Sequence, residues 1–127
     1  MHLKACHQRT GKGIAGQVEI ARTFLKRLIG LMGRSILMED QGLYFPGCKS
    51  IHTFGMKFAI DVLFMDKNMK ITKMISCLKP NRVAFAPFST RDTLELACGV
   101  LQQHALAVGD EIALIQIKHE GCNDGNE

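Results

Sequence analysis

Residues 54–66 read FGMKFAIDVLFMD, and the second half of this stretch decides the fold. Between residues 59 and 65 both alternating positions are apolar, except at Asp61. A half-exposed strand alternates apolar and polar residues, so apolar residues at both positions indicate a strand that is covered on both faces. The polar turn at 66–68 then ends the run. We therefore expect a central β-strand over residues 59–65.

Short apolar runs separated by turn residues surround this strand, which is typical of a β meander or barrel. Residues 70–78 also match helical spacing, but their position directly after a tight polar turn favours a strand that forms a hairpin with 59–65. Further strands are expected over 18–20, 43–45, 50–56, 82–86, 93–97 and 111–117.

Two segments have helical character. Residues 99–106 allow one short late helix, and an earlier segment places apolar side chains at helical spacing with cations between them and Gly33 as its C-cap. The apolar positions of this N-terminal amphipathic helix are Ile20, Phe24, Leu25, Leu28, Leu31 and Met32. The predicted class is α+β and mostly β: a compact antiparallel β-barrel or sandwich-like sheet with these helices.

The 127 residues are enough for one hydrophobic core and too few for two. Residues 1–17 are polar with three glycines, so we expect a flexible N-terminal segment. A single β-rich domain is expected over 18–117, followed by a flexible polar tail over 118–127. Apolar residues at 46% and charged residues at 22% are typical of a folded protein.

The net charge of +4 comes from cations scattered between Lys4 and Lys118. Nucleic-acid binding needs clustered cations, so we predict no nucleic-acid partner. The apolar stretches are too short to span a membrane, and the N-terminus has no apolar signal-peptide region. These features predict a soluble, cytoplasmic protein.

The five cysteines are odd in number and form no CxxC pair, which fits neither a zinc site nor a disulfide framework. Dispersed cysteines of this kind are typical of small buried apolar residues in a reducing compartment. Cys98, between alanine and glycine, is expected to be buried and inert. No metal or cofactor is predicted. The cysteines are Cys6, Cys48, Cys77, Cys98 and Cys122.

Five motifs occur in an order that resembles one known family, the bacterial and archaeal domain of unknown function 192. They are LIGLMGR at 28–34, GLYF at 42–45, the stretch 54–66, TLELACG at 93–99 and VGD at 108–110. The resemblance covers residues from about 18 to 117 and implies a bacterial protein. It implies a compact, largely antiparallel β fold packed with a helix and no established activity. Many relatives are exported or membrane-anchored, in contrast to the absence of a leader here.

Asp61 is the most informative residue, because a carboxylate inside an apolar strand must be paired, hydrogen-bonded or protonated. Lys57, Arg82, Arg91 and backbone amides are its candidate partners, and a structural acceptor is the preferred interpretation. Glu95 projects from the face opposite Leu94 and Leu96. It is either a solvated or ion-paired residue or, if its face lines a pocket, a second carboxylate that acts with Asp61 in acid–base chemistry or cation binding.

His52 is the histidine within the β region, and imidazole serves as an acid, a base or a metal ligand. Cys48 and Cys98 could be nucleophiles with His52 as base, but no flanking motif supports this. A single histidine without a second ligand at suitable spacing favours an ordinary strand or loop residue.

The leading functional hypothesis is a small non-catalytic binding or accessory module that takes a small ligand or peptide in a pocket near 50–57 and 93–96. One alternative is a small hydrolase or metal-assisted enzyme that uses His52 with Asp61 or Glu95. Another is a structural partner-binding domain with an exposed apolar patch. The ligand and the oligomeric state stay open. The candidate ligand-binding residues are His52, Thr53, Lys57, Asp61, Arg91 and Glu95.

Overall fold

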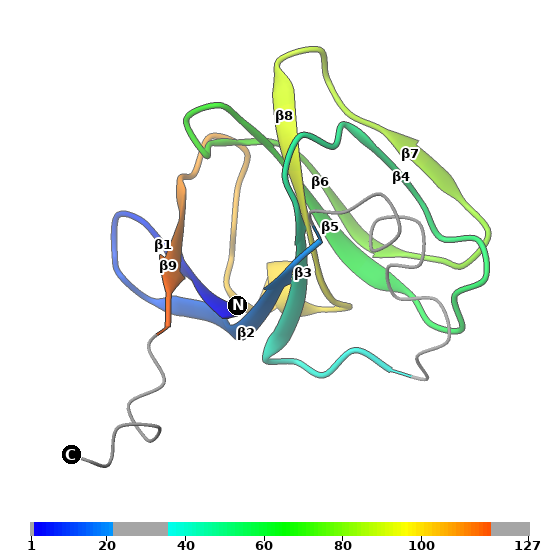
Figure 1. The fold of residues 1–127 in the computed structure, drawn as a ribbon, viewed down its shortest axis with the longest axis horizontal. Helices are drawn as coiled ribbons and strands as arrows, with labels where there is room; N and C mark the ends of the chain where they lie inside the picture. The colour runs from blue at the N-terminus through cyan, green and yellow to red at the C-terminus, as the bar shows by residue number, and fades with distance from the viewer. Residues whose placement is uncertain (1, 22–35, 118–127) are drawn as a thin grey trace.

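The computed structural model describes residues 2–21 and 36–117, and in this part of the chain the main element is a seven-stranded sheet (Figure 1). The strand order is β6-β5-β8-β3-β2-β1-β9, and a separate two-stranded sheet pairs β4 with β7. The strands are β1 (His2–His7), β2 (Gly13–Ile20), β3 (Gln41–Phe45), β4 (Ser50–His52), β5 (Ile60–Asp66), β6 (Ile71–Leu78), β7 (Val83–Phe85), β8 (Thr90–Ala97) and β9 (Ile112–Gln116).

The predicted central strand is β5, which lies between β6 and β8 in the sheet. Its residues 60–65 are all fully buried, as expected for a strand that is apolar on both faces. β6 pairs antiparallel with β5 directly after the turn at 66–70. The expected hairpin is therefore confirmed, and the helical spacing in 70–78 does not produce a helix.

The main sheet is curved but does not close into a barrel. Its two terminal strands, β6 and β9, approach each other at one end, where Lys70 and Glu111 form an isolated bridge. The sheet also contains one parallel pair, β2 with β3, among otherwise antiparallel neighbours. A parallel pair needs a crossover connection, and the chain supplies it between Ile20 and Gln41. The prediction of a mostly β fold is thus confirmed, and of its two alternatives, a barrel or a sandwich-like sheet, the closed barrel is wrong.

The N-terminal residues lie within the sheet, although the sequence predicted a flexible segment over 1–17. β1 pairs with both β2 and β9, and Ala5 and Val18 are fully buried. The polar turn between the two strands contains Gly11 at φ +75°, a conformation that glycine adopts without strain. The turn contributes polar residues and Gly11 to the composition of this segment. The short apolar runs on either side were therefore not recognised as strands.

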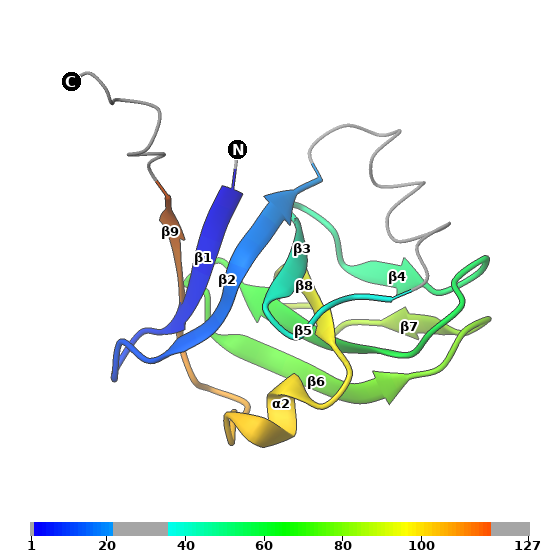
Figure 2. The same cartoon turned by 90° about the horizontal axis from the view of Figure 1, so that it is seen from below.

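The predicted amphipathic helix falls on residues 22–35, outside the described residues, apart from Ile20, which ends β2. The tail over 118–127 also lies outside them. The short late helix is present as α2 (Val100–Gln103), which directly follows β8 (Figure 2). None of the helices within residues 2–21 and 36–117 has the length and apolar character needed to cross a membrane.

The two-stranded sheet lies at the opposite end of the molecule from the β1 and β9 strands of the main sheet. In both views β1 and β9 lie at one end and β4 and β7 at the other, with β5, β6 and β8 between them (Figures 1 and 2). On β4 and β7 the paired residues Ile51 and Ala84 are buried. Because side chains alternate along a strand, the neighbouring residues of both strands face away from the core. This leaves an outer face on the two-stranded sheet.

Gly42 permits close packing between β3 and its two neighbours. A Cβ atom at this position would lie 3.0 Å from Leu96 Cδ2, 3.1 Å from the Glu95 carbonyl oxygen and 3.3 Å from Val18 Cγ2. The carbonyl oxygen belongs to the β8 backbone and cannot rotate away. A side chain here would therefore push β3 away from β8.

We expect Gly42→Ala to lower the free energy of unfolding by about 1–3 kcal/mol, the usual cost of overpacking a core. Urea denaturation measures this difference. Gly13→Ala is the matched control, since a Cβ on Gly13 meets nothing within 4 Å, and its effect should stay within about 0.5 kcal/mol. Equal effects of the two substitutions would show that the close approach at Gly42 is unimportant.

Candidate functional site

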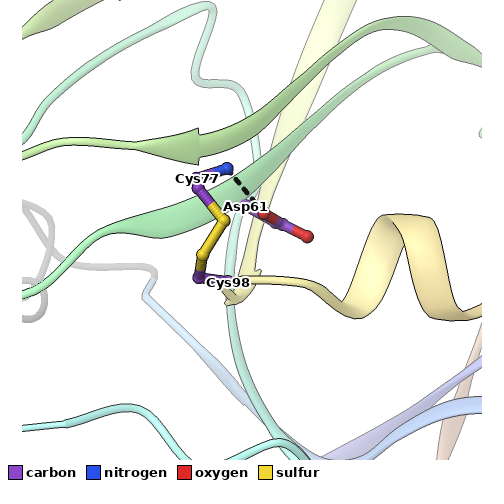
Figure 3. A group of neighbouring side chains, drawn as sticks. All are labelled: Asp61, Cys77 and Cys98. Atoms are coloured by element: carbon purple, nitrogen blue, oxygen red, sulfur yellow. Dashed lines mark hydrogen bonds between the residues drawn. A yellow bond between two sulfur atoms is a disulfide. The ribbon is translucent and has the colours of Figure 1, made fainter.

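The carboxylate of Asp61 is fully buried and accepts three backbone hydrogen bonds. The Cys77 amide donates to Oδ1 at 2.7 Å, and the amides of Gly99 and Leu101 donate to Oδ2 at 3.1 and 2.9 Å. Figure 3 shows Asp61 beside the Cys77 amide. Of the candidate partners of Asp61 named from the sequence, the backbone amides are the ones that bind it in the structure. Asp61 therefore connects β5 to β6 and to the start of α2.

A β-bulge in β6 supplies the first of these amides. Ile60 pairs with Leu78 and Val62 pairs with Ile75, so β6 has one residue more than β5 across this interval. A bulge leaves the extra residue out of the regular ladder and bends the strand. Cys77 adopts φ +47° here, and its amide points at the Asp61 carboxylate. The bulge thus directs a backbone donor toward the buried charge.

The start of α2 supplies the other two amides. The first amides of a helix have no partner within the helix and need an acceptor from elsewhere. Gly99 occupies the N-cap at φ +100° and has no side chain that could accept them. Asp61 accepts them from the neighbouring strand instead, and its negative charge is favourable at a helix N-terminus. A side chain remote in sequence therefore caps this helix.

A disulfide between Cys77 and Cys98 joins the same two segments (Figure 3). The Cα atoms are 4.8 Å apart, within the range that disulfides require. The expectation of a buried and inert Cys98 is wrong, because the residue is exposed and bonded. The pair is 21 residues apart without a recognisable spacing, and only the adjacency of β6 and β8 around β5 brings the two sulfurs together. The cysteines therefore no longer argue for a reducing compartment.

Among the described residues, Asp61 and the two disulfide cysteines also form a group that could hold a metal ion. Asp61, Cys77 and Cys98 each offer one ligand atom, and these atoms lie within 4.8 Å of one another. The two sulfurs are joined in the disulfide, so in this state they are not thiolate ligands.

Glu95 is also buried, with 4% of its surface exposed, but it lies on the other face of the sheet. In the β5–β8 ladder Asp61 is opposite Leu96, whereas Glu95 is opposite Val62. Residues that face each other across a ladder point to the same side, and successive residues point to opposite sides. The two carboxylates therefore do not converge. Burial raises the pKa of Glu95 from 4.5 to about 8.

Thr53 and His52 are adjacent but have different environments. Thr53 is fully buried; its hydroxyl donates to the Lys79 carbonyl at 2.7 Å and accepts the Arg82 amide at 2.9 Å. These bonds fix the chain after β4 and explain why the strand ends at His52 and does not reach residue 56. His52 is exposed, its ring stacks on Phe54 at a centroid distance of 5.2 Å, and its Nδ1 accepts the Phe54 amide at 3.3 Å.

Lys57 and Arg91 are exposed cations. Arg91 lies 3.6 Å from Asp92, a buried carboxylate that the sequence analysis did not single out. Asp92 accepts the Tyr44 hydroxyl and the Gly47 amide, each at 2.7 Å. The signal for Asp92 is its place within the alternation of β8, where it shares the face of Leu94 and Leu96. Asp92 thus holds the end of β3 against β8.

The outer face of β4 and β7 lies next to the predicted site residues His52 and Thr53. By register it presents His52 opposite Val83 and Ser50 opposite Phe85. Val83 and Phe85 are 48% and 69% exposed. Two further aromatic residues flank the strands, Phe54 stacked on His52 and Phe88 beneath the Lys49 ammonium at 5.3 Å. We call this surface the aromatic face; its members are Lys49, Ser50, His52, Phe54, Val83, Phe85 and Phe88.

Two cavities lined by described residues lie where the β1–β2 turn meets α2. One has a volume of about 440 Å³ and the other about 230 Å³, and His104 lines both. The smaller cavity also contains His7, whose Nε2 lies 3.3 Å from Asp110 Oδ2. None of the six candidate ligand-binding residues lines either cavity. These two cavities are therefore separate from the predicted site.

Residues 5–114 match the family DUF192, described as an Uncharacterized ACR. The chain belongs to this family. A UPF0127 protein of Pyrococcus horikoshii is 34% identical over 76% of this chain and 86% of its own length. A UPF0127 protein of Pyrococcus furiosus is 30% identical over 80% of this chain and 90% of its own length. The resemblance deduced from the motifs is confirmed, and DUF192 membership brings no assigned activity.

Solved structures share the DUF192 fold described here. A protein of unknown function from Novosphingobium aromaticivorans matches with a TM-score of 0.76 at 19% identity, over 89% of this chain and 84% of the other. A protein from Sinorhizobium meliloti matches with a TM-score of 0.76 at 20% identity, over 89% and 92%. At these identities the likeness concerns the fold alone.

We expect Asp61→Ala to lower the free energy of unfolding by about 3 kcal/mol or more, because buried amides lose their acceptor at a cost of about 1–3 kcal/mol each. Urea denaturation with the disulfide intact measures the change. Glu111→Ala, which truncates an exposed carboxylate, should change the stability by less than about 0.5 kcal/mol. A loss at Asp61 no larger than that of the control would contradict the role assigned to its hydrogen bonds.

Glu95 should make stability depend on pH. Between pH 4.5 and about 8 the folded state keeps a proton on Glu95 that the unfolded chain has released, so the stability from this group falls as pH rises through that window. The slope is at most about 1.4 kcal/mol per pH unit. Glu95→Gln should therefore gain stability relative to the native protein from pH 4.5 to 8, measured by chemical denaturation at each pH. A difference that stays constant with pH would refute the raised pKa, and Glu111→Gln serves as the exposed control.

Proposed function

We propose that this protein is a non-catalytic binding module that docks an acidic, partly apolar peptide segment of a partner protein on the aromatic face. The observation that carries the proposal is a group of exposed aromatic side chains with the exposed cations Lys49 and Arg82 beside it. Large apolar side chains are usually withdrawn from water, and exposed groups of them mark interaction surfaces. Phe88 is 96% exposed and Phe85 69% exposed.

The shape of the surface favours an extended peptide. The two strands of β4 and β7 form a short ribbon, and outward side chains on it recur at every second residue. An extended peptide has the same two-residue repeat, so it can place alternate side chains against such a surface. A membrane-binding surface usually collects its apolar side chains on one helix face. Here they are distributed along two strands and the flanking turns.

The charge around the surface selects an acidic partner. Lys49 lies over the Phe88 ring, Lys73 Nζ donates to the Phe85 carbonyl at 3.0 Å, and Arg82 directly precedes β7. Lys49, Lys57 and Arg82 are exposed. A cationic rim attracts an acidic segment and disfavours a basic one.

The arrangement of the candidate residues favours binding over catalysis. His52 is exposed, and among the described residues no hydrogen bond or ion pair joins it to Asp61 or Glu95. General acid–base catalysis needs such groups within hydrogen-bonding reach of one site. Under this proposal His52, Lys57 and Arg91 contribute to the surface or its rim, while the buried Thr53, Asp61 and Glu95 support the strands beneath it.

The test uses a fluorescein-labelled synthetic peptide in which glutamate alternates with leucine, titrated with the full chain and followed by fluorescence anisotropy. We expect the double variant Phe85→Ala/Phe88→Ala to weaken binding by at least about tenfold, because truncating an aromatic anchor at an interface commonly costs more than about 1 kcal/mol. Binding should also weaken as salt is raised, since exposed charges are screened.

Ile115→Ala is the matched control, because Ile115 is 50% exposed on β9 at the other end of the molecule, and it should bind as the native chain does. Unchanged binding by the double variant would overturn the proposal. Tighter binding to vesicles that contain anionic lipid, or to a single-stranded oligonucleotide, would also overturn it in favour of a different partner.

A further inference from the structure

We propose that, once the Cys77–Cys98 disulfide is reduced, the two sulfurs and the Asp61 carboxylate form a binding site for a divalent transition-metal ion, with Zn²⁺ as the best match. This inference is independent of the proposed peptide-binding function, since the site lies on β5, β6 and the β8–α2 junction, and the aromatic face lies on β4 and β7. It would give the protein two alternative cross-links at one place, a covalent one and a metal one.

The geometry provides three converging ligands. One ligand atom each from Asp61, Cys77 and Cys98 falls within 4.8 Å of the other two. In a tetrahedral zinc site with Zn–S distances near 2.3 Å, two thiolate sulfurs lie about 3.8 Å apart. Opening the disulfide allows the sulfurs to separate to this distance by side-chain rotation, because both belong to segments whose backbone Asp61 holds in place.

The ligand set suits zinc. Thiolates together with a carboxylate are established zinc ligands, whereas calcium and magnesium prefer oxygen ligands alone. Cys98 is exposed, so water can reach the metal from that side and complete a fourth position. The product would be an open site with three protein ligands, which is the arrangement that leaves one position exchangeable.

The carboxylate is positioned for this role before any metal arrives. A carboxylate has about four lone-pair sites, and three of those of Asp61 accept amide hydrogen bonds. Hydrogen bonds to a ligand fix its orientation and add to metal affinity. The amides of Gly99 and Leu101 would therefore hold Asp61 in place and leave one lone pair of Oδ1 for the metal. This combination of a buried, oriented carboxylate and an accessible cysteine pair is what distinguishes the site from an ordinary surface disulfide.

The chemistry balances as a two-electron exchange followed by proton release. A dithiol reductant attacks the disulfide and leaves as its own cyclic disulfide, giving two electrons and two protons to Cys77 and Cys98. The metal ion then displaces the two thiol protons to solvent and binds two thiolates and one carboxylate. Reduction alone removes the covalent link between β6 and β8, and metal binding restores a link between the same residues.

The experiment reduces the full chain with dithiothreitol, removes the reductant by anaerobic gel filtration and titrates with Co²⁺, whose thiolate charge-transfer absorption reports sulfur ligation. We expect the reduced protein to bind one equivalent of Co²⁺ with this absorption, Zn²⁺ to displace it, and the oxidised protein to show none. Cys98→Ser should weaken binding by more than about tenfold, since even the loss of a hydrogen-bond partner of a ligand costs 10–100-fold.

Cys48→Ser is the matched control, because Cys48 is a free, partly exposed cysteine outside the site, and its reduced form should bind Co²⁺ as the native chain does. A ¹¹³Cd NMR signal from the reduced Cd²⁺ complex tests the third ligand, with a shift in the range of two sulfurs plus oxygen expected. Absence of thiolate charge transfer in the reduced chain, equal affinity of Cys98→Ser, or a cadmium shift typical of three or four sulfurs would each overturn the proposal.

Discussion

A charged carboxylate inside an apolar strand is stable only if donors surround it, and in this protein that requirement organises the centre of the fold. The amides that donate hydrogen bonds to Asp61 belong to the β6 bulge and to the start of α2. Each of these segments is locally unfavourable, because Cys77 has a positive φ and the first amides of α2 have no partner within the helix. The buried Asp61 carboxylate accepts hydrogen bonds from both segments, and the disulfide joins the same segments covalently.

The two other buried acids discussed above, Asp92 and Glu95, have different environments in the sheet. Asp92 accepts a hydroxyl and an amide and ties β3 to β8. Glu95, on the opposite face from Asp61, has its pKa raised by burial, so the neutral form is favoured. The central strands thus use Asp61 and Asp92 to hold the scaffold, whereas Val83 and Phe85 are exposed on the small β4–β7 sheet. Because Asp61 and Glu95 lie on opposite faces of the sheet, the motif carboxylates do not form one pair.

The sequence predicts much of the middle of the fold, because burial on both faces gives β5 its continuous apolar run and the polar turn gives the hairpin with β6. It also predicts that Asp61 needs a partner. It does not predict which one, since Cys77, Gly99 and Leu101 are remote in sequence and only the β6–β5–β8 order brings them together. The same applies to the disulfide. β1 was missed because its apolar residues are few and adjoin a glycine-rich turn. The aromatic face was not predicted, because the exposure of Phe54, Phe85 and Phe88 depends on strand register and turn geometry that the sequence does not reveal.

Native-state hydrogen exchange of individual amides tests the central claim most directly. The amides of Gly99 and Leu101 lie outside the strand ladders and at the start of a four-residue helix, and the acceptor of both is Asp61. The account predicts that both exchange as slowly as the amides of β5, at a rate set by global unfolding. Exchange at the rate of a mobile loop, with β5 still protected, would show that Asp61 does not hold α2 and would contradict the account.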